Sequence, residues 1–68
     1  MELKIGDLVK ISFKHLERMW VKLTEINGDD MTGILENYPL DPDAVGVNHG
    51  DEVKFKRDDI LDIQQEFF

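Results

Sequence analysis

Residues 18–35 of the chain read RMWVKLTEINGDDMTGIL, and this stretch decides the fold. Two β-rich runs flank Asn27-Gly28, a dipeptide that is the strongest short-range signal for a β-hairpin. Apolar residues occupy every second position from Met19 to Leu23, so they share one face of the first run. The stretch therefore predicts two paired strands, the first of which buries one face.

Two details inside this hairpin predict where it departs from regular pairing. The alternation after Leu23 would place Glu25 inside, so we expect a β-bulge near Thr24-Glu25 that returns Ile26 to the inner face. Gly33 interrupts the second strand, and an isolated strand glycine indicates a bulge, a sharp bend or a close approach of another backbone. In a small barrel, a bend is the simplest of these explanations.

The register of the hairpin stays open at this point. If Asn27 and Gly28 form a two-residue turn, Val21 lies opposite Ile34. A four-residue turn instead sets Leu23 opposite Ile34. A slip of one residue would exchange the two faces of the strand, so the choice matters for the core.

The rest of the chain predicts three further strands. Residues 37–50 contain both prolines and no sustained period, which favours a long loop with a helical turn after Pro42. Residues 14–17 read as a loop, and residues 57–59 suit a 3₁₀ turn. The last strand turns either Leu61 and Ile63 or Ile60 toward the core. The expected strands span about residues 7–13, 18–26, 30–36, 52–56 and 60–64.

This order of elements predicts an all-β fold. A central hairpin, a loop, a strand, a 3₁₀ break and a short closing strand resemble an SH3-like barrel. We therefore expect residues 1–68 to form a single small five-stranded SH3-like barrel with one long loop, about 37–50, and a 3₁₀ turn before the last strand. The alternative is an open antiparallel sheet that pairs with a second copy through an edge strand.

Three runs carry a resemblance to a known family. They are RMWV at 18–21, GILENYP at 33–39 and GDEVKF at 50–55, together with Ile60 and Asp62. In combination they resemble the YegJ-like family of uncharacterised bacterial domains over about residues 6–63. The resemblance implies a small bacterial domain of unknown function and supplies no activity. It also implies that several residues belong to a shared pattern, namely Trp20, Asn37, Pro39, Gly50 and Asp51.

Composition narrows the class of partner. Fifteen acidic and eight basic side chains give a net charge of −7, which opposes nucleic-acid binding because that depends on Lys and Arg at phosphates. A strip formed by Lys10, Lys22, Lys54 and Lys56 is the feature that keeps nucleic acid as an alternative. No cysteine and no long apolar run occur, and we expect a cytoplasmic protein without disulfides or a membrane span.

Catalytic and metal motifs are weak in this sequence. Ser12 is the only serine and no base accompanies it in a known motif, so we expect no enzyme. Residues 41–52 place acidic residues and Gly at some EF-hand positions, but Val45 replaces a ligand and strands replace the flanking helices. His15 and His49 lie on separate loops without ligand spacing. We therefore predict neither a metal nor another cofactor.

The predicted binding residues are Trp20, Tyr38, His49 and Asp51. Trp20 lies on the face opposite Val21, where it either anchors an interface or packs under the long loop and closes the barrel. We expect a non-catalytic module that binds a protein partner through these residues. The alternatives are a homodimer, formed by an edge strand or by Phe67-Phe68, and a nucleic-acid-binding barrel.

Overall fold

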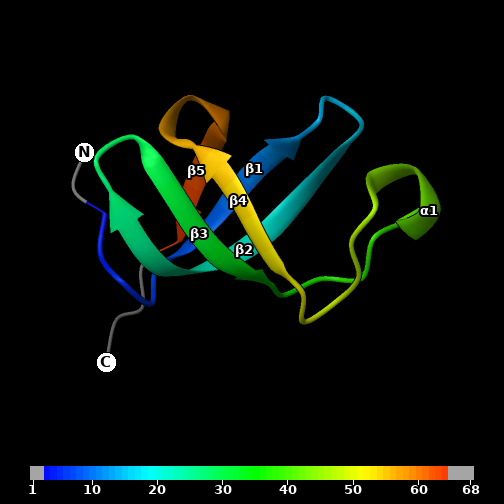
Figure 1. Cartoon of the computed structure of the whole chain (residues 1–68), viewed down its shortest axis with the longest axis horizontal. Helices are drawn as coiled ribbons and strands as arrows, with labels where there is room; N and C mark the ends of the chain where they lie inside the picture. Colours follow the sequence, from blue (N-terminus) through cyan, green and yellow to red (C-terminus); the bar gives the residue numbers. More distant parts are fainter. Residues whose placement is uncertain (1–2, 65–68) are drawn as a thin grey trace.

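Five antiparallel strands form one sheet in the order β4-β3-β2-β1-β5 (Figure 1). The computed structural model describes residues 3–64, so the predicted contact through Phe67-Phe68 lies outside the described residues. The prediction of an all-β, SH3-like arrangement with five strands is confirmed. The elements are β1 (Leu8–Phe13), β2 (Glu17–Asn27), β3 (Asp30–Leu35), α1 (Pro42–Val45), β4 (Glu52–Lys56), the 3₁₀ turn η1 (Arg57–Asp59) and β5 (Ile60–Gln64).

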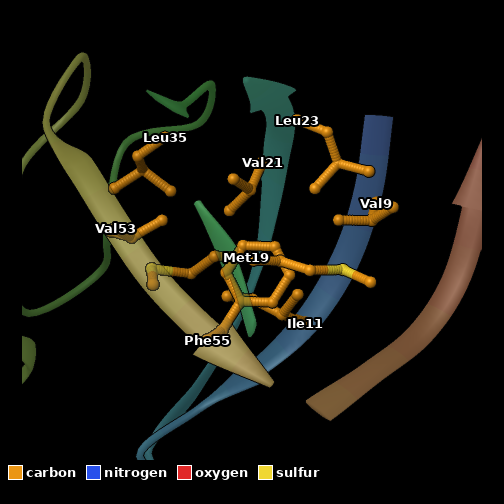
Figure 2. Close-up of a cluster of buried hydrophobic side chains, with 9 residues drawn as sticks. Val9, Ile11, Met19, Val21, Leu23, Leu35, Val53 and Phe55 are labelled. Carbon is orange, nitrogen blue, oxygen red and sulfur yellow. The ribbon is translucent and has the colours of Figure 1, made fainter. Parts of the chain in front are cut away.

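One apolar core lies on the inner face of the curved sheet (Figure 2). The alternation read from the sequence is confirmed in β1, β2 and β4, where the inner positions are buried. Each fully buried side chain of this size contributes about 1.5–3 kcal/mol, so this cluster is the main source of stability. Its members are Val9, Ile11, Met19, Val21, Leu23, Met31, Leu35, Val53 and Phe55.

The bulge expected in β2 is present and sets the hairpin register. The β2–β3 pairing shifts between Leu23 and Glu25, and Ile26 packs against the core beyond the shift. Leu23 lies opposite Gly33, so both registers considered from the sequence are wrong for the part of β2 that precedes the bulge. The extra residue in β2 accounts for the difference, because it moves every pair beyond it by one position.

Close packing requires a glycine at position 33. A Cβ atom at this position would lie 2.3 Å from Val21 Cγ1 and 2.6 Å from the backbone oxygen of Lys22. Gly33 also faces inward between Met31 and Leu35, where neighbouring strands approach each other tightly. Its backbone is not in the left-handed region, so the missing side chain is what the position demands.

The β2–β3 turn is one residue later than the sequence suggested. Asn27 pairs with Asp30, and the two loop residues are Gly28 and Asp29. Gly28 has a φ of +62°, which is the requirement for the first loop position of a type II′ turn. Asn27 therefore ends β2 and has no positive φ.

Two ion pairs join this turn to the end of β4 and to η1. Lys56 pairs with Asp30, and Arg57 Nε lies 3.4 Å from Asp29 Oδ1. The hydrogen bond that the Lys56 ammonium donates to Asp30, together with the charge of that carboxylate, raises the pKa of Lys56 above 10.5. Both pairs are exposed, so each adds little to stability.

The last strand and the first turn each hold a local irregularity. In β5 the inner residues are Ile60 and Ile63, whereas Leu61 points outward because the β1–β5 pairing contains a bulge. The loop expected at residues 14–17 is a tight turn of residues 14–16, in which Lys14 and His15 both have positive φ, +53° and +57°. No helix within residues 3–64 is long and apolar enough to cross a membrane.

Candidate functional site

The β3–β4 loop (residues 36–51) is the longest irregular segment of the described chain, and hydrogen bonds close its base. The Leu35 N–H donates to the Asp51 carbonyl at 2.9 Å, and the Gly50 N–H donates to the Leu35 carbonyl at 2.8 Å. These bonds extend the β3–β4 pairing to Leu35, one position beyond the last strand pair, Ile34 with Glu52. The loop therefore leaves the barrel from a narrow, fixed stem, as compact surface loops do.

Asn37 ties the start of the loop to β2. Its Oδ1 accepts a hydrogen bond from the Trp20 N–H at 2.7 Å, and the Glu36 N–H donates to the Trp20 carbonyl at 2.9 Å. A side-chain acceptor here replaces the strand that would otherwise pair with this part of β2. The backbone position at which the loop leaves β2, just before Tyr38, is consequently fixed.

Asp51 fixes the end of the loop in the same way. Its Oδ2 accepts from the Asn48 N–H at 2.8 Å, and its own N–H donates to the Asn48 carbonyl at 3.0 Å. Gly50 completes this turn with a φ of +87°, in the region that glycine adopts without strain. The turn holds His49 at its exposed tip.

The middle of the loop is the short helix α1, and the predicted helical turn after Pro42 is confirmed. Asp41 caps it by accepting from the Ala44 N–H, and Gly46 ends it with a φ of +78°. Val45 is buried at 1% exposure, which anchors the helix from below. A four-residue helix has little stability of its own, so this anchor and the caps hold it in place.

The β1–β2 turn supports the loop from the side, and both lie at the same end of the molecule (Figure 1). Lys14 Nζ donates to the Val45 carbonyl at 3.2 Å. The Leu40 N–H donates to a carboxylate oxygen of Glu17, which is the first residue of β2. Two loops distant in sequence therefore form one continuous surface.

Large apolar side chains gather on this surface and face solvent. Tyr38 is 77% exposed, Leu40 92% and Leu16 61%. Only Ile5 and Leu61 are comparable elsewhere in residues 3–64. The rings of Tyr38 and His49 stack with centroids 4.4 Å apart and planes inclined by 12°. We call the set Leu16, Tyr38, Leu40 and His49 the loop surface.

The structure brings together three of the four predicted binding residues. Tyr38 and His49 form the stack, and Asp51 holds the turn that carries His49. Trp20 is bound to the loop through its backbone, but its side chain is half-buried on the outer face of the sheet, where Lys10 Nζ lies 5.9 Å from the ring centroid. It is not a member of the core cluster.

Sequence reasoning missed Leu16, Leu40 and the residues that join the two loops. Leu40 and Leu16 are isolated apolar residues in polar segments. No sequence pattern shows whether the side chain of such a residue is exposed or buried. Glu17 and Lys14 act through hydrogen bonds to backbone groups far along the chain, which sequence spacing does not reveal.

The sequence also matches a family model over residues 2–65, and that model is described as an uncharacterized protein conserved in bacteria (DUF2314). The chain belongs to this family. Membership establishes a bacterial domain of unknown function and assigns no reaction or ligand. No curated protein and no solved structure matches the chain.

Within the described part of this DUF2314 domain, the two acidic loop residues that accept hydrogen bonds, Asp41 and Asp51, have local partners rather than a common centre. Asp41 caps α1 and Asp51 accepts from Asn48, so each carboxylate serves its own turn. No group of three or more metal-ligating side chains gathers in residues 3–64. What the loop surface offers is exposed aromatic and aliphatic area on a fixed scaffold.

Proposed function

We propose that this domain is a non-catalytic protein-binding module whose contact area is the loop surface. The observation that carries the proposal is that Tyr38 and Leu40 remain exposed although the loop around them is held by hydrogen bonds and by buried Val45. Exposed aromatic and aliphatic side chains on a prearranged surface are the usual anchors of interfaces, because little ordering entropy is lost when they bind. Trp20, on the outer sheet face, is a second candidate anchor.

Several more specific statements belong to this proposal. The resemblance to YegJ-like domains is more specific than membership of the DUF2314 family, and we keep it as a proposal. A cytoplasmic location, the absence of an enzymatic activity and the absence of nucleic-acid binding stay predictions. The homodimer formed through an edge strand also stays an alternative to a separate protein partner.

Site-specific photocrosslinking in the bacterium that makes the protein tests the proposal. A photoreactive phenylalanine analogue replaces Tyr38 in one strain and Leu61 in another, since Leu61 is also exposed, at 52%, but lies on β5. We expect a protein adduct that forms from position 38 and not from position 61. Adducts that are the same from both positions, or that contain only a second copy of the chain, contradict the proposal.

Binding measurements complete the test, and they use the purified protein that was crosslinked from position 38. Truncation of an interface anchor typically costs about 1–2 kcal/mol or more. Tyr38→Ala and Leu40→Ala should therefore each raise the dissociation constant about tenfold. Leu61→Ala is the matched control and should leave it unchanged. Trp20→Ala shows whether the contact extends onto the sheet. Unchanged affinity in both loop variants would exclude the loop surface as the contact area.

A further inference from the structure

The charge of the molecule is concentrated on the segment that carries Tyr38, Leu40 and His49 of the loop surface. Residues 36–52 form a quarter of the chain and contain five acidic side chains but no Lys or Arg. They hold five of the seven excess negative charges, whereas the other 51 residues are nearly balanced, with ten acidic and eight basic side chains. The strong net charge is therefore a local property of the β3–β4 loop and its stem.

All five of these side chains are exposed, and they are Glu36, Asp41, Asp43, Asp51 and Glu52. The two Lys–Asp and Arg–Asp ion pairs found in residues 3–64 both lie at the β2–β3 turn, away from this segment. The nearest cation that bonds to the loop, Lys14, donates to the Val45 carbonyl and not to a carboxylate. Within the described residues, none of these five carboxylates therefore forms an ion pair with a Lys or Arg side chain.

From this combination we infer that the loop surface binds a basic segment of a partner protein, in which Lys or Arg residues flank a large apolar side chain. The apolar residue contacts Leu40 and Leu16, and the cations face the five carboxylates. Arginine suits the Tyr38–His49 stack best, because a guanidinium plane stacks on an aromatic face while its N–H groups bond to carboxylates. The inference rests on the proposed function and adds the chemistry of the partner.

Electrostatics of this kind govern specificity and association rate. Single exposed ion pairs contribute little, whereas several like charges around one contact area attract a basic segment over the Debye length and repel an acidic one. Binding should therefore weaken by about tenfold or more when the salt concentration rises from about 0.05 M to about 0.5 M. An interface carried by apolar contacts alone would not show this dependence.

The test begins with a random twelve-residue peptide display library selected on the purified full chain. A parallel selection uses the Tyr38→Ala, Leu40→Ala double variant, and a known peptide-binding domain confirms that the library works. We expect the peptides enriched on the natural chain alone to contain Lys or Arg beside Leu, Phe or Trp. Backbone amide shifts in NMR spectra then locate the bound peptide on the chain.

Variants that remove charge separate the electrostatic contribution to binding from the contribution of the apolar contacts. Glu36→Gln, Asp43→Asn and Glu52→Gln together remove three charges without disturbing the capping residues Asp41 and Asp51, and should weaken binding about tenfold. The control, Glu25→Gln with Asp58→Asn and Asp62→Asn, removes the same charge from elsewhere and should change affinity by less than about twofold.

The outcomes distinguish the two proposals. Peptides that bind the loop surface without a basic bias overturn the inference about the partner and leave the protein-binding function in place. Peptides whose amide shifts lie away from the loop, or no enrichment while the control domain selects its peptides, overturn both. Equal effects of the two charge-variant sets also overturn the inference, because the loop would then have no particular role.

Discussion

Replacing Gly33 by alanine tests the close approach that closes the β2–β3 corner of the barrel. The new Cβ would lie 2.6 Å from the Lys22 carbonyl oxygen and 2.3 Å from Val21 Cγ1, whereas ordinary contact begins at 3.4 Å. The side chain of Val21 is buried and the Lys22 oxygen belongs to the backbone, so neither can turn away. The strands must therefore separate by about 0.8 Å to relieve the contact with the oxygen, and Val21 Cγ1 must be displaced by about 1.1 Å.

The expected loss is large for a domain of this size. Overpacking a core by one methyl group typically costs 1–3 kcal/mol, and a clash with backbone belongs to the upper part of that range. A 68-residue chain has a total stability of roughly 3–10 kcal/mol. We expect Gly33→Ala to lower the free energy of unfolding by about 2–3 kcal/mol. With a urea slope of about 1 kcal/mol per molar, the midpoint falls by about 2 M or more.

Urea unfolding followed by the fluorescence of Trp20, the only tryptophan, measures this loss. Gly28→Ala is the matched control, since its Cβ would meet nothing within 4 Å but its φ of +62° strains alanine by about 1 kcal/mol. Gly33→Ala should be clearly worse. Adding Val21→Ala should recover part of the loss, because it removes one of the two clashes. A loss at Gly33 below about 1 kcal/mol, or no larger than the loss at Gly28, would refute the packing argument.

Three further changes follow from local geometry. His15→Gly should raise the free energy of unfolding by about 0.5–1 kcal/mol in thermal or urea unfolding, because the φ of His15 is +57°; an unchanged or lower stability would contradict the turn geometry. Asn37→Ala should cost about 1–2 kcal/mol and speed hydrogen exchange at the Trp20 amide, whereas Asn37→Asp keeps the acceptor and should preserve protection. The pKa of Lys56 is raised above its ordinary 10.5 by Asp30, so the stability from this pair is present at lower pH and is lost as pH rises through the folded-state pKa. In Lys56→Met, the free energy of unfolding should fall less as the pH is raised through this range. An equal fall in the natural chain and in Lys56→Met would exclude the pair as the cause.

The strands could be read from the sequence because their cause is local. Alternation in β1, β2 and β4 reports directly which side chains face the core, and the bulge after Leu23 follows from the position of Ile26 in the same run. The turn position was wrong by one residue because it depends on pairing. Asn27 bonds to the Glu25 side chain and to β3, so Gly28 becomes the first loop residue.

The loop surface could be predicted only in part, because its placement depends on bonds between distant residues. Asn37 bonds to β2 across 17 positions, Leu40 to Glu17 across 23, and Lys14 to Val45 across 31. No periodicity in the sequence relates such pairs. Tyr38 and His49 were recognised as aromatic loop residues, but their stacking follows from where these bonds set the two arms of the loop.

The residues that hold the β3–β4 loop differ from those that it displays, and this separation has a measurable consequence. Asn37, Asp51 and Val45 fix the backbone through hydrogen bonds and burial, while Leu40 is 92% exposed. Removing the Leu40 side chain therefore withdraws almost no apolar area from the core, and Leu40→Ala should change the free energy of unfolding by less than about 0.5 kcal/mol. The Tyr38→Ala change loses the stack with His49 but no core contact, so a similarly small effect is expected. If both variants unfold like the natural chain in urea, any affinity that they lose belongs to the contact with a partner. A large loss of stability in Leu40→Ala would instead show that this side chain supports the loop, and the loop surface would then have to be redrawn without it.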